Sequence, residues 1–316
     1  AGIHLILNDT FSPFSFWNTL QQECVNICSV VPEILRVLCR RPAHQKRFPH
    51  LRYLVSAAAP LSAEISKQFY EKTAIPIHQG YGLSESTNFA TTLPYDIPLE
   101  EYFSVMHSQP QPSIGTSLYG STVVIINQRG EKIEAGITGE IVIQGHSNML
   151  GYWRDEEATQ QALGDGFLHT GDLGFYVSYG KRDYFFITGR IKEIILRCGQ
   201  NISPLEIERE LLFLQKMGDF AIVGFQHDQV GEEVGLYIST NVPNLISPHS
   251  FDPLTEMPFF KRPKVVVIES KPIPRTSTGK IRRGSLRNFF NECHDWRFGN
   301  GQVVLIRTGE KDDRNS

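Results

Sequence analysis

The run GYGLSES combines an aromatic ring, a hydroxyl group and a carboxylate within seven positions. Tyr81 lies between Gly80 and Gly82, and Ser84 and Glu85 come shortly after it. Because glycine has no side chain, the backbone on either side of the ring could lie close to a flat ligand. Hydroxyl and carboxylate oxygens suit a phosphate and its Mg²⁺. A plain tight turn would use the same glycines, so this run alone leaves both interpretations open.

Two further runs follow predicted strands and could contact a nucleotide. In the run TGD, residues 170–172, the Asp172 carboxylate could accept hydrogen bonds from a ribose diol. An aspartate that caps a loop is the more ordinary explanation of this run taken alone. In the run SAAAPL, residues 56–61, the small Ala58 and Ala59 would let a flat ligand lie against the backbone. A tightly packed strand end explains these small residues equally well.

A fourth run, PRTSTGK at residues 274–280, is rich in turn-forming residues and carries Lys280 at its end. This composition predicts a mobile loop. A lysine at the tip of such a loop could reach a phosphate only when a lid closes, and there it would stabilise negative charge. The alternative is a solvated basic face, because Arg282 and Arg283 come directly after it.

These runs are separated by the stretch TGRIKEIILRCGQNISPLEIE, residues 188–208, which has the character of a joint. A turn is predicted at Gly189-Arg190, and a second at residues 199–201, because Gly and Asn tolerate positive φ. Ser203 and Pro204 then predict the start of a helix, with the serine as cap and the proline in the first turn. We interpret this stretch as the joint between two domains, although an ordinary surface corner is the commoner case.

The elements before residue 113 alternate between helices and apolar strands, which predicts an α/β fold with a largely parallel sheet. Residues 15–40 predict a helix, a strand and a helix, and residues 62–72 predict an amphipathic helix. The remaining predicted strands of this part are residues 3–7, 51–57 and 75–79.

From residue 113 to 190, short strands separated by turn residues predict a small β-barrel or twisted β subdomain. Two of these strands are expected at residues 167–169 and 174–176. Residues 191–316 then predict a compact α+β domain, so the domain boundary is placed after residue 190. The chain's last residues, GEKDDRNS at 309–316, are expected to be disordered.

The composition is ordinary for a globular protein of 316 residues, with 41% hydrophobic and 21% charged residues. A net charge of −3 argues against bulk nucleic-acid binding. No apolar run is long enough to span a bilayer, and no signal-peptide pattern opens the chain. The five cysteines form no CxxC pair, which favours free thiols in a reducing compartment, so a cytoplasmic location is expected.

The four runs, in this order and with the joint between the third and the fourth, resemble the adenylate-forming superfamily. This group includes acyl-CoA synthetases, aryl-CoA and fatty-acyl-AMP ligases, peptide-synthetase adenylation domains and firefly luciferase. The resemblance extends from about residue 2 to residue 286. Further runs that agree with the family are Gly139-Glu140-Ile141, Gly151-Tyr152-Trp153, Gly199 with Ile202 to Glu208, and Gly224 to Glu232. Several spaced motifs in one order are far more specific than any one of them.

The resemblance implies a large domain that ends at residue 190 and a small C-terminal lid domain after it. It also implies a nucleotide site in the large domain. Tyr81, followed by Gly82, would stack on adenine, with Ala58 and Ala59 against the other side of the base. Ser84 would contact the nucleotide phosphate.

The same resemblance assigns roles around the phosphates and the joint. Glu85 would help to hold Mg²⁺, and Asp172 and Arg190 would bind the ribose hydroxyls of ATP or AMP. Lys280 would bridge the substrate carboxylate and the α-phosphate. Lys192 would be the hinge about which the small domain rotates.

The implied function is that of the C-terminal part of an ATP-dependent, AMP-forming acid–thiol ligase. Such an enzyme activates a small carboxylic acid as its adenylate and transfers the acyl group to a thiol, whose channel Gly199 would line. Coenzyme A is the expected acceptor. The alternative is a fatty-acyl-AMP ligase or an adenylation enzyme that loads the phosphopantetheine of an acyl carrier protein. A phosphate-binding loop of the type TSGTTGxPKG is absent from the sequence. We therefore expect this chain alone to adenylate poorly, which leaves a non-catalytic nucleotide-binding fragment as a further alternative.

Overall fold

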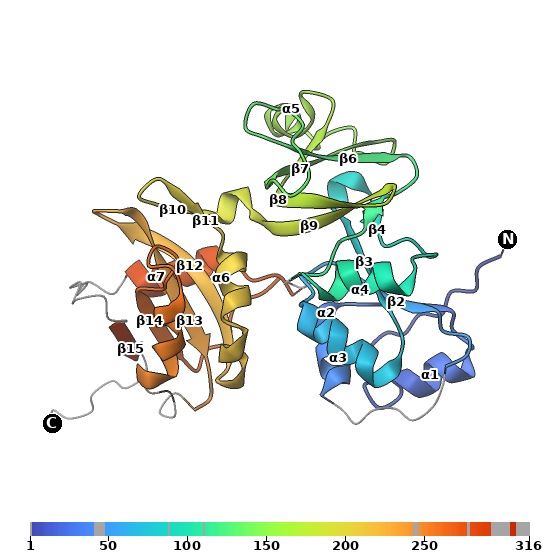
Figure 1. Cartoon of the computed structure of the whole chain (residues 1–316), viewed down its shortest axis with the longest axis horizontal. Coiled ribbons are helices and arrows are strands. Elements are labelled where there is room, and N and C mark those ends of the chain that lie inside the picture. Colours follow the sequence, from blue (N-terminus) through green and yellow to red (C-terminus); the bar gives the residue numbers. More distant parts are fainter. Residues whose placement is uncertain are drawn as a thin grey trace. The chain divides into compact units, whose positions relative to one another are not determined.

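The computed structural model describes residues 2–40, 48–87, 89–109, 111–242, 246, 248–276, 279–291 and 304–307. The chain folds as two compact units, Ala1–Ile187 and Thr188–Ser316. The first unit runs from blue to yellow-green in Figure 1, and the second from yellow to red. The expected disordered end, residues 309–316, lies outside the described residues.

The first unit contains a five-stranded sheet in the order β1-β2-β3-β4-β5. The first three strands are parallel and the last two antiparallel, so the sheet is mixed rather than largely parallel. The strands are β1 (Ile27–Val30), β2 (Tyr53–Ser56), β3 (Ile77–Gly82), β4 (Phe89–Thr92) and β5 (Thr116–Ser117), and the helices are α1 (Phe16–Gln22), α2 (Pro32–Cys39), α3 (Ala63–Thr73) and α4 (Leu99–His107). Residues 3–7 do not form the expected strand, because no described strand pairs with them.

Local signals explain the helices of this unit. Ser62 caps α3, and its hydroxyl accepts a hydrogen bond from the Ile65 amide at 3.2 Å. Pro32 occupies the first turn of α2, where its missing N–H leaves no bond unmade. The apolar faces of the helices pack with the sheet into one core, which includes Leu35, Leu54 and Phe69.

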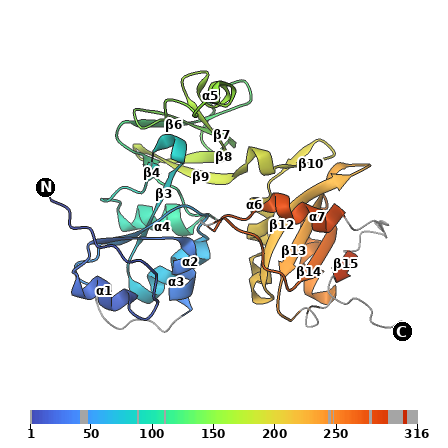
Figure 2. The ribbon, with the colours of Figure 1, turned by 180° about the vertical axis from the view of Figure 1, so that it is seen from behind.

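A second sheet of the first unit has four strands in the order β6-β7-β8-β9. These are β6 (Ser121–Ile126), β7 (Gly139–Gly145), β8 (Leu168–Tyr179) and β9 (Arg182–Arg190), and α5 (Glu156–Leu163) precedes β8. The expected small β-barrel is wrong, because β6 and β9 are the two ends of this order and the described strands leave the sheet open. The sheet is the upper part of the first unit in Figures 1 and 2.

The long strand β8 replaces the two short strands expected at residues 167–169 and 174–176. Gly174 was expected to begin the second of these strands. Gly174 instead lies in close contact with the neighbouring strands, since a Cβ there would come within 2.4 Å of the Phe186 carbonyl oxygen. The glycine therefore permits close packing of the sheet and does not end the strand.

The second unit is built on a six-stranded sheet in the order β11-β10-β13-β14-β15, with β12 also paired to β13. The elements are β10 (Ile195–Arg197), β11 (Gln200–Ile202), α6 (Pro204–Glu210), η3 (Leu212–Lys216), β12 (Asp219–His227), β13 (Gly231–Ser239), η5 (Pro248–Glu256), β14 (Val265–Glu269), α7 (Arg283–Asn291) and β15 (Val304–Arg307). This part thus combines helices and 3-10 turns with one mixed sheet.

Both faces of this sheet are buried. Phe220 and Ile222 of β12 belong to the core that contains Ile207 of α6. Val223 belongs to a second core, which contains residues of α7. Because side chains alternate along a strand, the two cores lie on opposite faces of β12. Figure 1 accordingly shows α6 and α7 on either side of the sheet. None of the described helices is both long and apolar enough to cross a membrane.

Candidate active site

Tyr81 and Asp172, predicted from separate runs, are in direct contact in the first unit. The Tyr81 hydroxyl donates a hydrogen bond of 2.8 Å to Oδ2 of Asp172, across 91 positions of sequence. Both residues are buried, with 9% of Tyr81 and 4% of Asp172 exposed. The ring of Tyr81 packs in the core between the two sheets, together with Phe185. The contact therefore places an aromatic ring and a carboxylate at one fixed point.

The backbone around Asp172 is held by its own neighbours. The Asp172 amide donates to Oγ1 of Thr170 at 3.0 Å, and that hydroxyl donates to the Ile141 carbonyl at 2.6 Å. Gly171 has a φ of +68°, in the left-handed region that favours glycine. Its amide donates to Oε1 of Glu140 at 3.0 Å. Glu140 belongs to the Gly139-Glu140-Ile141 motif, and no pattern in the sequence indicates that it supports Asp172.

Ala58 and Ala59 follow β2 at the edge of the sheet where β3 reaches Tyr81. The parallel register pairs Ser56 with Gln79, so both strands run out toward the same edge. Ala58 is exposed and has a backbone φ of +73°, which residues other than glycine rarely adopt. The small residues are thus at a free strand end, and one of them has a strained backbone.

Gly80 has a packing role that the sequence did not show. A Cβ at this position would come within 2.5 Å of the Phe89 ring. Gly80 therefore makes room for Phe89 of the adjacent strand β4. Gly82 is the last residue of β3, and the register with β4 shifts between Tyr81 and Gly82.

Ser84 and Glu85 lie in the short helix η1 (Ser84–Ser86), which follows β3. Ser84 is exposed and Glu85 is half-buried. The Tyr152 hydroxyl donates to Oε1 of Glu85 at 2.8 Å, and this hydrogen bond raises the pKa of Tyr152. The Met149 amide donates to the Glu85 carbonyl at 2.6 Å. Tyr152, which belongs to the Gly151-Tyr152-Trp153 motif, thus orients Glu85, the predicted metal ligand.

Gly199 belongs to the second unit and forms the turn of the β10–β11 hairpin. Cys198 and Gly199 have φ values of +48° and +77°, and Arg197 pairs with Gln200 across them. Positive φ at both central residues is typical of a type I′ turn. The turn lies one residue earlier than the predicted 199–201. The predicted cap of the next helix is confirmed, because Oγ of Ser203 accepts from the Glu206 amide at 3.4 Å.

The predicted hinge lies at the start of the second unit. Arg190 ends β9 and is half-buried, and the exposed Lys192 is the middle residue of η2 (Ile191–Glu193). Next to Lys192, Oε2 of Glu193 lies 3.1 Å from the Arg283 guanidinium. The same guanidinium lies 2.7 Å from both carboxylate oxygens of Glu208. Arg283 therefore links the predicted hinge to α6, which sequence reasoning did not anticipate.

Lys280 also belongs to the second unit, at the end of a short hairpin. Its carbonyl accepts a hydrogen bond from the Thr276 amide at 2.8 Å, and its amide donates to Oγ1 of Thr276 at 3.1 Å. Arg275 bonds Asp219 at 2.7 Å and thereby fastens the hairpin to β12. The Lys280 side chain is exposed. Residues 277 and 278 of the predicted mobile loop lie outside the described residues.

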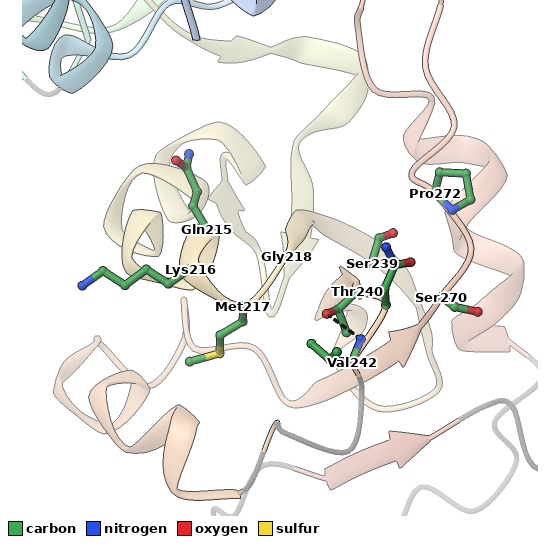
Figure 3. Close-up of a pocket in the computed structure, with 10 residues that line it drawn as sticks. Gln215, Lys216, Met217, Gly218, Ser239, Thr240, Val242, Ser270 and Pro272 are labelled. Carbon is green, nitrogen blue, oxygen red and sulfur yellow. Dashed lines mark hydrogen bonds between the residues drawn. The ribbon is translucent and has the colours of Figure 1, made fainter. Parts of the chain in front are cut away.

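Two further features bear on ligand binding. Among the described residues, no three His, Cys, Asp or Glu side chains gather closely enough to hold a metal ion. An open pocket of about 650 Å³ lies in the second unit, between the turn at residues 215–218, the end of β13 and residues 270–272. Figure 3 shows these lining residues, and Lys216 points away from the hollow. None of the predicted site residues lines this pocket.

Comparisons with known proteins identify the family that the chain resembles. The family model described as "AMP-binding enzyme" matches residues 1–153. Oxalate–CoA ligase of Arabidopsis thaliana is 28% identical over 296 residues, which are 92% of this chain and 55% of that protein. Probable 4-coumarate–CoA ligase 1 of Dictyostelium discoideum is 30% identical over 91% of this chain and 51% of its own.

Among solved structures, ATP-bound MatB from Rhodopseudomonas palustris superposes with a TM-score of 0.76 at 27% identity, over 90% of this chain and 55% of that one. The chain thus spans about half the length of the curated relatives it matches. The family model, the curated relatives and the structural likeness all indicate the same superfamily. The chain therefore belongs to the adenylate-forming superfamily.

Proposed function

We propose that the chain is the nucleotide-binding and lid portion of an ATP-dependent, AMP-forming ligase, which activates a carboxylic acid and passes it to coenzyme A. The observation that carries this proposal is the hydrogen bond from Tyr81 to Asp172. It joins an aromatic ring to a buried carboxylate beside the free end of β2, as a site for a nucleoside requires. A local turn or a solvated face would not need these two runs to meet.

In this proposal each group of the first unit contacts one part of the nucleotide. Tyr81 and Gly82 lie against adenine on one side, and Ala58 and Ala59 on the other. The Asp172 carboxylate accepts hydrogen bonds from the ribose hydroxyls.

Ser84 and Glu85 would serve the phosphates and Mg²⁺. The exposed hydroxyl of Ser84 suits a phosphate oxygen. A single half-buried carboxylate, Glu85, suits Mg²⁺, which commonly binds one or two carboxylates together with substrate phosphates. Tyr152 fixes the orientation of that carboxylate. When bound, Mg²⁺ would offset negative charge on the phosphates.

The second unit would supply the cation for adenylation. A carboxylate that attacks an α-phosphate brings two anions together, and Lys280 would lower the repulsion between them. Its exposed position at a hairpin end suits a residue that enters and leaves a site. The hinge role of Lys192 and the place of Gly199 in the thiol channel are what the family resemblance implies, and they form part of the proposal. The relatives named above are CoA ligases, which favours coenzyme A over a carrier protein as acceptor.

Calorimetry with the chain as it stands tests the nucleotide site. We expect AMP to bind, and we expect pyrophosphate to produce little response because no TSGTTGxPKG-like run is present. Asp172→Ala should abolish AMP binding. Asp183→Ala is the control, since Asp183 lies exposed on the neighbouring strand β9 and accepts a hydrogen bond from the nearby Ser178 at 2.6 Å. Equal AMP affinity in the wild type and Asp172→Ala would refute the proposal. Robust pyrophosphate exchange would refute the expected weak adenylation.

A further inference from the structure

His169 lies between two carboxylates, three positions before Asp172. Its Nδ1 is 3.0 Å from Oε2 of Glu140, and its Nε2 is 3.0 Å from Oδ2 of Asp165. A neutral imidazole carries one N–H and would face one of these carboxylates with a lone pair. The doubly protonated ring donates to both. The geometry therefore favours the imidazolium form of His169.

The ionisation equilibria agree with this geometry. Partial burial of His169 opposes its protonation, but the hydrogen bonds and charges of Glu140 and Asp165 outweigh burial and raise its pKa above the ordinary 6.5. Slight desolvation acts to raise the pKa of Asp165, but the Phe167 amide and His169 outweigh it and lower that pKa. Both shifts describe an ion pair that forms on folding.

Glu140 connects this ion pair to the backbone beside Asp172. Its two oxygens have different partners, with Oε2 facing His169 and Oε1 accepting the Gly171 amide at 3.0 Å. The Glu140 side chain is 18% exposed and that of His169 is 29% exposed. Gly171 is followed directly by Asp172, whose carboxylate meets Tyr81. A change in the charge of His169 can thus affect Asp172 through the Glu140 carboxylate and the Gly171 peptide.

We propose that Glu140 and His169 are positioning residues for the Asp172 carboxylate, and that the protonated His169 holds Glu140 in the place where it fixes the Gly171–Asp172 backbone. The proposal rests on the proposed function in taking Asp172 as a ribose ligand. It goes further in naming the residues that set the position of Asp172. It also makes the affinity for a nucleoside depend on pH.

The charged groups around β8 include the two ion-pair partners of His169 and five other residues of the first unit. Within the described residues, its ion pairs go to Glu140 of β7 and Asp165 of the preceding turn. The remaining charged residues of β8, of α5 and of β9 within the first unit are Asp172, Glu156, Glu157, Arg182 and Asp183.

The direction of the pH effect follows from the raised pKa of His169. The support that the imidazolium gives is complete below pH 6.5, the ordinary histidine value, and is lost as the pH rises through the higher folded value. Above that pH, one carboxylate faces a lone pair and moves away. If Glu140 is the one that moves, the Gly171 amide loses its partner, and Asp172 loses its fixed position.

Nuclear magnetic resonance provides the first test. We expect the ring proton of His169 to titrate above pH 6.5, and the Gly171 and Asp172 amide signals to move with the same midpoint. In Glu140→Gln the side chain keeps its size and an oxygen for Gly171 but can donate to a neutral His169, so the midpoint should fall. The control His146→Gln, which changes an exposed histidine of the same unit, should leave the amide titration intact. Amide signals that ignore the His169 titration would overturn the proposal.

Binding of adenosine provides the second test, because adenosine has no phosphate group to titrate. We expect the affinity of the wild type for adenosine to be about three- to tenfold higher at pH 6 than at pH 9. This factor corresponds to the contribution of about one hydrogen bond. Glu140→Gln should reduce this ratio to near one, and His146→Gln should keep it. Equal wild-type affinity at both pH values would overturn the proposal. If adenosine bound at neither pH, the proposed function would fail, and the amide titration would decide the positioning role by itself.

Discussion

Replacement of Arg283 by methionine should destabilise the second unit strongly. The guanidinium bonds both oxygens of Glu208 at 2.7 Å and the Ile222 carbonyl at 3.1 Å. Only 13% of each side chain of the Arg283–Glu208 pair is exposed. Methionine keeps most of the length but leaves Glu208 as a nearly buried carboxylate without its ion-pair partner. Breaking one side of a buried pair costs about 3–5 kcal/mol, and we expect about 3 kcal/mol here because the pair is not wholly buried.

Amide hydrogen exchange can measure this loss of stability in the second unit by itself. A chain with two units does not unfold in one step, so a single melting curve would not report on Arg283 alone. Amides of β12 and β13 should exchange on the order of a hundredfold faster in Arg283→Met. Arg287→Met is the matched control on the same helix, because Arg287 is 41% exposed and lies 3.5 Å from Glu232. That variant should lose at most about 1 kcal/mol.

The pH dependence makes the prediction sharper. Burial raises the pKa of Glu208 above its ordinary 4.5, and Arg283 opposes that rise. Without Arg283 the pKa rises further, so folded Arg283→Met takes up a proton more readily than the unfolded chain. The loss of unfolding free energy relative to wild type is therefore complete above the raised pKa of Glu208 in the folded variant. It shrinks as the pH falls through that pKa toward 4.5. A deficit below about 1 kcal/mol, or one that grows at low pH, would refute the reasoning.

Three other substitutions have definite expected outcomes. Ala58→Gly should stabilise the first unit by about 0.5–1 kcal/mol, seen as a higher thermal midpoint, because φ is +73° at this position. Tyr81→Phe should cost about 1–3 kcal/mol of unfolding free energy in denaturant and weaken AMP binding, because buried Asp172 loses a donor. Lys280→Ala should leave stability within about 0.5 kcal/mol, because its side chain is exposed. In a form of the protein that forms adenylates, the same change should stop that step, and an unchanged rate would exclude Lys280 from it.

Local signals in the sequence predicted much of the fold. Ser203 and Pro204 define the start of α6 with residues that are neighbours in the chain, and Ser62 does the same for α3. The break predicted within β8 was wrong. Gly174 allows close packing against the neighbouring strands and does not end the strand. The closed barrel was wrong for a related reason. Short strands and turns indicate a β region, but whether its first and last strands pair depends on contacts far apart in sequence.

The candidate site shows the same limit. The meeting of Tyr81 and Asp172 spans 91 positions, and only the order of motifs in a known family suggested it. Glu140, His169 and Arg283 carry no local signal of their partners. A carboxylate in a strand has the same pattern whether it faces water or an imidazole. The supporting contacts therefore became visible only with the structure.

The two-sided burial of β12 has a consequence for how the second unit can be shortened. Because both faces of this sheet are buried, loss of the elements that cover either face would expose apolar side chains to water. Truncation ahead of α7 would uncover Phe225 and Val267, which pack with Phe290. Such a product would present a broad apolar plane and would self-associate. The smallest soluble form of this unit must therefore reach at least as far as Phe290.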